Sequence, residues 1–222
     1  MSPPVASGPP FTTDESKERK MTEPTTFDLG PQTRVVARLA AAVPDARLAD
    51  PTPCPDYAVR NLLGHLTGLA VAFRDAARKD LGPTTDAAPD TTVPSLPADW
   101  REALPRVLDE LAEAWRDPSA WTGMTRAGSV DLPGEIAAAV AVDELVIHGW
   151  DLARATGQEY VPDATALGAS HAFLLAAAED ESRGGGIFGA VVPVPDDAPL
   201  LDRAVGLSGR DPSWTPLAAR GR

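Results

Sequence analysis

The segment 134–155 is rich in alanine, valine and leucine, yet it carries Glu144 and His148 four residues apart. In a helix this spacing places both side chains on one face, about one turn apart. Asp151 shares that face, and its other members are small or apolar: Ala137, Val140, Ala141, Leu152 and Ala155. Burying a carboxylate and an imidazole costs free energy unless a partner compensates them. The segment therefore predicts a long helix with a paired polar site on its buried face.

Two partners for this pair are compatible with the helix alone. A divalent metal ion is one, because a carboxylate and a histidine one turn apart can both reach an ion from the same helix. The other is the pair itself, as a Glu144–His148 hydrogen bond within the core. The helix leaves both interpretations open.

His65 brings a third ligand into consideration. It falls within a predicted helix at 57–79, at the edge of the apolar stripe that contains Leu62 and Leu69. Taken alone, a histidine in this position is most simply a structural residue at the edge of the core. Two histidines and one carboxylate from two helices, however, form a set that binds Zn²⁺, Fe²⁺ or Ni²⁺ and leaves coordination positions open. His65, Glu144 and His148 are therefore the candidate metal ligands, and His171 is interpreted as structural.

Two further residues have alternative roles. Asp151 follows His148 by three residues. It is a candidate to orient His148 by a hydrogen bond to the ring nitrogen that does not bind the metal, without being a metal ligand itself. Equally, it could pair with Arg154 or cap a neighbouring group. Cys54 precedes the second predicted helix, whose dipole could lower the thiol pKa, although a lone cysteine in a Pro-rich loop is more often a packing residue. No general acid or base is assigned.

Composition narrows the function classes. The formal net charge is −12, which disfavours binding to nucleic acids and to anionic membrane surfaces. The single cysteine excludes an intramolecular disulfide. The N-terminus lacks the pattern of a secretory signal, and no apolar stretch of about 18 residues occurs, so a cytoplasmic protein without a membrane span is expected. A homodimer is left open.

The pattern along the chain predicts a mainly all-α fold. Aromatic residues make up only 5% of the sequence, which favours close helix packing through alanine, leucine and valine. We expect a four-helix bundle with a long crossover at 81–97, a small hairpin between Trp121 and Leu132, and a C-terminal strap. Asp56 and Asp197 are predicted to cap the second and the last helix. The predicted helices are 29–42, 57–79, 98–116, 134–155, 164–181 and 199–207.

Three regions follow from this organisation. Residues 1–26 are expected to be a disordered tail, since they are rich in proline, serine, threonine and charge, and Met21 is an alternative start. Residues 27–183 are expected to form the four-helix-bundle metal-binding domain. Residues 184–222 are expected to form a strap and a short helix packed on the bundle.

Three stretches carry a resemblance to a known family: Pro51-Thr-Pro-Cys-Pro-Asp-Tyr-Ala-Val-Arg-Asn-Leu-Leu-Gly-His-Leu, Glu144-Leu-Val-Ile-His-Gly-Trp-Asp-Leu-Ala-Arg-Ala-Thr-Gly-Gln, and Phe188-Gly-Ala-Val-Val-Pro-Val-Pro-Asp-Asp-Ala-Pro. They resemble the metal-binding domain of the mycothiol-dependent maleylpyruvate isomerases, within the DinB-like four-helix-bundle superfamily. The last stretch resembles an actinobacterial subfamily of metal-binding proteins. The resemblance covers about residues 28–213.

The resemblance implies a metal triad of His65, Glu144 and His148. The superfamily includes thiol-dependent isomerases and S-transferases whose metal is understood to bind the cofactor thiol. The characterised isomerases have a separate C-terminal domain, whereas only the strap follows the bundle here, so the isomerase reaction itself is not carried over.

The expectation is thus a divalent metal, zinc first with nickel or iron as alternatives, that activates a thiol such as mycothiol. The thiol would then react with a small electrophile in an isomerisation or S-transfer. Two alternatives stay open, a non-catalytic metal-binding or regulatory protein with a structural ion, and a helical interaction module without metal. Whether the protein is an enzyme is left open.

Overall fold

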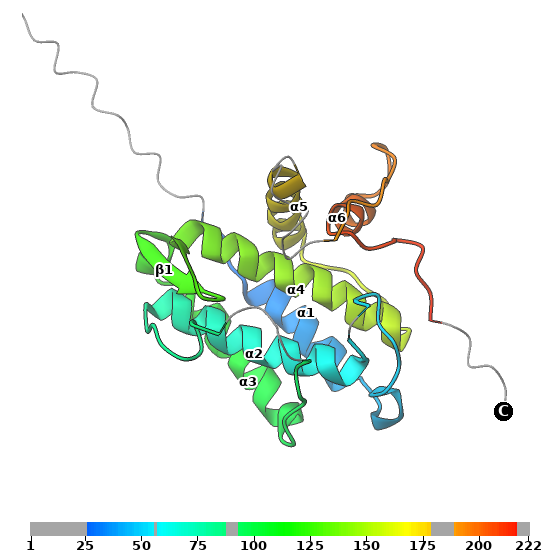
Figure 1. Cartoon of the computed structure of the whole chain (residues 1–222), viewed down its shortest axis with the longest axis horizontal. Helices are drawn as coiled ribbons and strands as arrows, with labels where there is room; N and C mark the ends of the chain where they lie inside the picture. The colour runs from blue at the N-terminus through cyan, green and yellow to red at the C-terminus, as the bar shows by residue number, and fades with distance from the viewer. Residues whose placement is uncertain (1–25, 56, 88–92, 179–188, 217–222) are drawn as a thin grey trace, which may run out of the picture.

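A computed structural model describes residues 26–55, 57–87, 93–178 and 189–216. Helices α1 (Gly30–Ala41), α2 (Val59–Arg78), α3 (Trp100–Ala114) and α4 (Gly134–Thr156) form a closed bundle. Within it, α1 packs against α3 and α4, and α2 packs against the same two helices (Figure 1). The prediction of a mainly helical fold with a small hairpin is confirmed. None of the helices within the described residues is long and apolar enough to cross a membrane.

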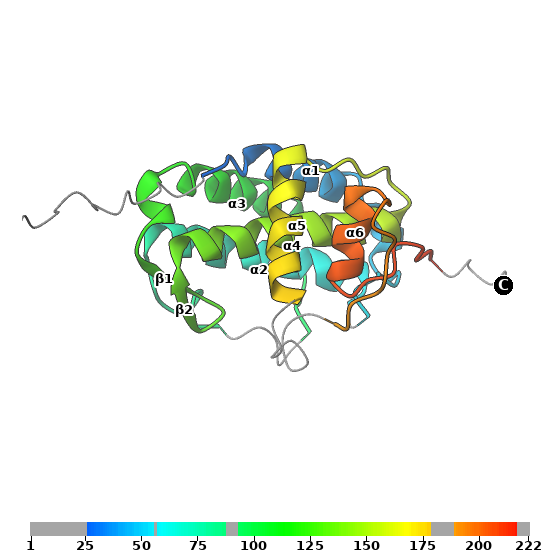
Figure 2. The same cartoon turned by 90° about the horizontal axis from the view of Figure 1, so that it is seen from above.

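Two further helices lie on one side of α4. Helix α5 (Ala164–Ala178) packs on α4, and α6 (Leu200–Leu207) packs on α5. Figure 2 shows α5 running across α4, with α6 beside it. Helix α4 is covered by the bundle on one side and by this pair on the other, and it supplies more buried residues than any other described helix. His148 and Asp151 of α4 are thereby buried, whereas the side chain of Glu144 stays 22% exposed.

The predicted hairpin is present and helps to shape one end of the bundle. Strands β1 (Met124–Ala127) and β2 (Val130–Pro133) pair antiparallel, with Ala127 opposite Val130. The two residues between them, Gly128 and Ser129, have φ of 60° and 64°, as a type I′ turn requires. The hairpin contacts both α2 and α4, so it forms a wall beside them. Two short 3₁₀ helices, Asp45–Arg47 and Pro118–Trp121, complete the described elements.

Helix ends are where the sequence-based predictions were least accurate. Helix α2 begins at Val59, and Asp56, its predicted cap, lies outside the described residues. At Ala58, which directly precedes the helix, the backbone N–H donates to Oδ1 of Asn61 at 3.1 Å. Asp197 does not cap α6, because Pro199 precedes that helix and no side chain caps it. The predicted end of the fifth helix, 179–181, also lies outside the described residues.

Candidate metal centre

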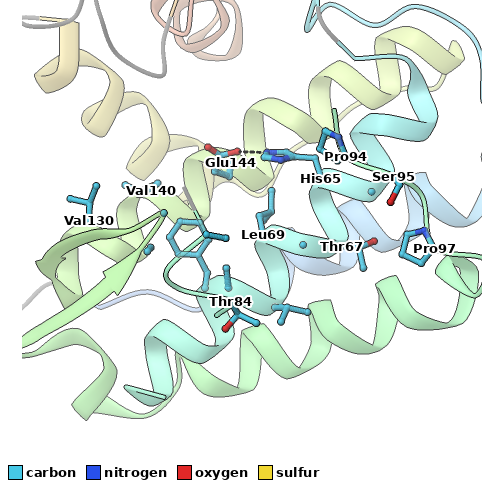
Figure 3. Close-up of a pocket in the computed structure, with 18 of the residues that line it drawn as sticks. His65, Thr67, Leu69, Thr84, Pro94, Ser95, Pro97, Val130, Val140 and Glu144 are labelled. Carbon is cyan, nitrogen blue, oxygen red and sulfur yellow. Dashed lines mark hydrogen bonds and ion pairs between the residues drawn. The ribbon is translucent and has the colours of Figure 1, made fainter. Parts of the chain in front are cut away.

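The three candidate ligands meet between two neighbouring helices of the bundle. His65 lies in the middle of α2, while Glu144 and His148 lie one turn apart on α4. One ligand atom from each residue lies within 4.8 Å of the other two. Figure 3 shows the His65 ring pointing from α2 toward the carboxylate of Glu144. The structure therefore brings together residues that are 79 positions apart in the sequence.

The two imidazoles approach the same carboxylate oxygen. Nε2 of His65 lies 3.3 Å from Oε2 of Glu144, and Nε2 of His148 lies 3.0 Å from it. These two distances fit a transition metal, because ligands at about 2.1 Å from a tetrahedral ion lie about 3.4 Å from one another. The same distances also suit hydrogen bonds in the absence of an ion. Geometry alone thus accommodates both interpretations of the pair.

Asp151 holds the other side of the His148 ring. Its Oδ2 lies 2.9 Å from Nδ1 of His148, and its side chain is completely buried. This contact places the Nδ1 proton between histidine and carboxylate and directs Nε2 toward Glu144. Arg154 does not pair with Asp151, since its guanidinium donates to the backbone carbonyls of Pro212 and Trp214.

Arg210 is the site residue that the sequence analysis missed. It follows α6, and its guanidinium donates to both carboxylate oxygens of Asp151, with Nε–Oδ1, Nε–Oδ2 and Nη2–Oδ2 distances of 3.0, 3.1 and 3.0 Å. The C-terminal segment is thereby connected through Asp151 to His148. No local sequence pattern predicts the Asp151–Arg210 pair, because the two residues are 59 positions apart.

The electrostatics of this buried chain of groups favour its charged forms in the metal-free protein. Burial alone would raise the pKa of Glu144, but the hydrogen bonds from His148 and His65 outweigh burial and lower it. For His148, burial opposes the charge, and the hydrogen bonds to Asp151 and Glu144 nevertheless raise the pKa to about 9. The pKa of Asp151 is lowered despite burial, chiefly by the charge of Arg210. Metal binding at His148 must therefore displace a proton.

A pocket of about 730 Å³ adjoins the triad. His65 and Glu144 stand at its edge, and His148 is not among its lining residues. Their side chains are 25% and 22% exposed, against 8% for His148, so the site opens toward the pocket from the α2 side. Helix α2, the loop around Pro94–Pro97 and the hairpin form the walls (Figure 3).

The other residues considered from the sequence lie outside this cluster. Cys54 sits half-buried in the loop before α2, where its backbone N–H donates to Oγ1 of Thr52. His171 lies on α5, and burial and the charge of Arg203 lower its pKa. Neither belongs to the group of potential ligands around Glu144 in the described part of the chain.

Comparison with known proteins places this chain in a family. The family model of the mycothiol maleylpyruvate isomerase N-terminal domain matches residues 29–153, more than half of the chain. The chain belongs to this family. The match spans α1 to α3, the hairpin and most of α4, and therefore includes the three candidate ligands and Asp151. Arg210 lies beyond the part that the mycothiol maleylpyruvate isomerase domain covers.

Two proteins of Mycobacterium tuberculosis are also similar to this chain, one from strain CDC 1551 / Oshkosh and one from strain ATCC 25618 / H37Rv. Both are described as uncharacterised. Each is 27% identical over 175 residues, which cover 78% of this chain and 91% of the relative. No solved structure matches the chain.

Proposed function

We propose that the protein holds a divalent metal ion on His65, Glu144 and His148 and uses the site to activate a low-molecular-weight thiol such as mycothiol. Zinc is the first choice, with nickel and iron as alternatives, because two imidazoles and a carboxylate suit all three. One observation carries the proposal: three potential ligand atoms lie within 4.8 Å at the edge of an open pocket, in a chain of the mycothiol maleylpyruvate isomerase domain family.

The chain's own residues supply the positioning. Asp151 fixes the tautomer and orientation of His148, so that Nε2 is the nitrogen available to an ion. Within the described residues no fourth histidine, cysteine or carboxylate joins the group. Structural zinc sites usually have four protein ligands, whereas catalytic sites have three and keep a position for water or substrate. The set of three supports the catalytic interpretation over a structural ion.

The bound ion would lower the pKa of a thiol at the site and so raise the fraction of thiolate at neutral pH. The pocket beside His65 and Glu144 gives a thiol and a second small molecule access to the same place. An S-transfer and a thiol-assisted isomerisation both begin with attack of the sulfur on an electrophilic carbon. The proposal covers both reactions.

Cobalt substitution tests this proposal directly. In the Co²⁺-loaded protein, added mycothiol or a close thiol analogue should produce a sulfur-to-metal charge-transfer band, while an alcohol of similar shape should not. The Cys54→Ala variant should give the same band, because the sulfur comes from the added thiol. An absorption spectrum of the Co²⁺-loaded protein that does not change when thiols are added would contradict thiol activation. A structural or regulatory ion would then be the better explanation.

A further inference from the structure

The pocket beside the triad owes its volume to small residues on one face of α2. Gly64, Gly68 and Ala72 follow one another at four-residue spacing and all line the pocket. At Gly64 an added Cβ would lie 2.5 Å from the carbonyl oxygen of Ser95, so this glycine lets the loop pack onto the helix. At Gly68 an added Cβ would meet nothing within 4 Å. A glycine in mid-helix costs up to about 1 kcal/mol relative to alanine, and here it leaves open space in the pocket.

The remaining walls are mainly apolar, although Thr67, Thr84 and Ser95 also line the pocket. Leu69 and Phe73 come from α2, Leu132 and Val130 from the hairpin, and Val140 from α4. Figure 3 shows Val130, Val140 and Leu69 around the space next to Glu144. Val130 is 57% exposed, which for a large apolar side chain is consistent with a place at the mouth of a binding pocket. A volume of this size falls within the range of roughly 300–1,000 Å³ typical of small-molecule sites.

The charges around the pocket oppose an anion. Glu144 is an acidic lining residue, and no lysine or arginine belongs to the described lining. Two arginines are sequence neighbours of lining residues, but both are paired. Arg126 contacts Asp86 and Asp131, and Arg74 contacts Asp75 and Glu110. The charge of a divalent ion at the proposed site would be balanced by Glu144 and the bound thiolate, so a carboxylate brought into this pocket would lose water without gaining a net cationic partner, which is costly.

We propose that this pocket takes the second substrate, and that this substrate is an uncharged, hydrocarbon-rich electrophile rather than a carboxylic acid. The inference rests on the proposed function, which supplies the thiol. In the transfer, the thiolate sulfur donates its electron pair to the electrophilic carbon and forms a C–S bond. The bond from that carbon to its leaving group breaks, and the leaving group departs with the bonding pair.

Binding to the metal-free protein tests the pocket without any contribution from metal or thiol. The probes are 1,3-dinitrobenzene and its anionic counterpart 3,5-dinitrobenzoate, titrated while the backbone amide NMR signals of Gly68 and Gly128 are followed. The neutral probe should shift these signals, and the anion should bind about tenfold more weakly or worse. Equal or tighter binding of the anion would overturn the proposal.

A matched pair of glycine variants locates the binding. Gly68→Leu should fill the pocket and weaken the binding of 1,3-dinitrobenzene, followed in both variants through the Gly128 signal, by about tenfold or more. Gly168→Leu is the control, because Gly168 is also an exposed helical glycine with nothing within 4 Å of an added Cβ, and it lies on α5, outside the lining. It should bind the probe like the wild type. If both variants bind alike, the probe does not occupy this pocket.

Reactivity tests the same charge argument in the metal-loaded protein with mycothiol. Here 1-chloro-2,4-dinitrobenzene should react faster, relative to the uncatalysed reaction, than 4-chloro-3,5-dinitrobenzoate. Val130→Lys should improve the rate for the anion relative to the neutral probe by about fivefold, and Val161→Lys, also at an exposed valine but outside the lining, should not. A preference for the anion in the wild type would contradict the substrate class. If neither probe reacts while 1,3-dinitrobenzene binds as predicted, the result contradicts thiol activation at the metal and still supports the pocket as a site for uncharged molecules.

Discussion

Replacing Arg210 with methionine should destabilise the metal-free protein by about 3 kcal/mol, because it removes the main partner of a buried carboxylate. Arg210 makes three contacts of 3.0–3.1 Å with Asp151, whose side chain is completely buried. Breaking a buried ion pair from one side costs about 3–5 kcal/mol. We expect the lower end of this free-energy range, because Oδ2 of Asp151 keeps its contact with His148. Oδ1 loses the donor that the structure gives it, which is Nε of Arg210.

Arg154→Met is the matched control for this experiment. Arg154 also connects α4 to the C-terminal segment, but it donates to backbone carbonyls of Pro212 and Trp214 rather than to a carboxylate. Its replacement should cost only about 1 kcal/mol. The double variant Asp151→Asn with Arg210→Met should be more stable than Arg210→Met alone, because the charge that needs the arginine is gone.

Urea denaturation at pH 7 with a chelator present, followed by far-ultraviolet circular dichroism, measures these differences as shifts of the midpoint at unchanged slope. If Arg210→Met lowers the free energy of unfolding by no more than Arg154→Met does, Arg210 serves only to anchor the C-terminal segment. The argument from the buried charge of Asp151 would then be refuted.

Two further predictions concern stability. The pKa of His148 rises from 6.5 to about 9 on folding, so the protonated ring stabilises the metal-free protein fully below about pH 6.5. The free energy of unfolding should therefore fall as the pH rises from 6.5 to about 9. Urea titrations across this range should show this fall in the wild type and not in His148→Gln. On α2, Gly64→Ala should destabilise by about 1–3 kcal/mol, because its Cβ would clash with the Ser95 carbonyl, whereas Gly68→Ala, where the space is open, should stabilise by up to about 1 kcal/mol. Equal melting temperatures for the two alanine variants would contradict the packing described at these glycines.

The part of the site that lies on α4 could be predicted from sequence because it depends on local periodicity alone. The apolar repeat defined the helix, and the four-residue spacing put Glu144 and His148 on one face, as the structure shows. Gly157, at φ 71°, ends the helix near its predicted end. For His65, periodicity indicated only the edge of a stripe, and its place beside Glu144 was expected from the donor chemistry and the family resemblance.

Long-range contacts account for most of what the sequence did not predict. Arg210 reaches Asp151 from the segment after α6, and nothing in the spacing of a single arginine near the C-terminus indicates a buried partner. The start of α2 likewise depends on Asn61, whose Nδ2 donates to the carbonyl of Pro94 in the distant loop. A signal for the pocket was present in the two glycines four residues apart on α2. Such glycines weaken a helix and therefore indicate a packing or binding reason.

Metal content of the purified protein tests the central claim most directly. Mass spectrometry of the wild type, purified without added chelator, should find about one divalent ion per chain, as a single set of three protein ligands implies. Variants His65→Ala, Glu144→Ala and His148→Ala should each lose most of it. His171→Ala should keep it, because His171 lies on α5, outside the ligand group. Triad variants that stay loaded, or an empty site in His171→Ala, would contradict the assignment of the metal to His65, Glu144 and His148.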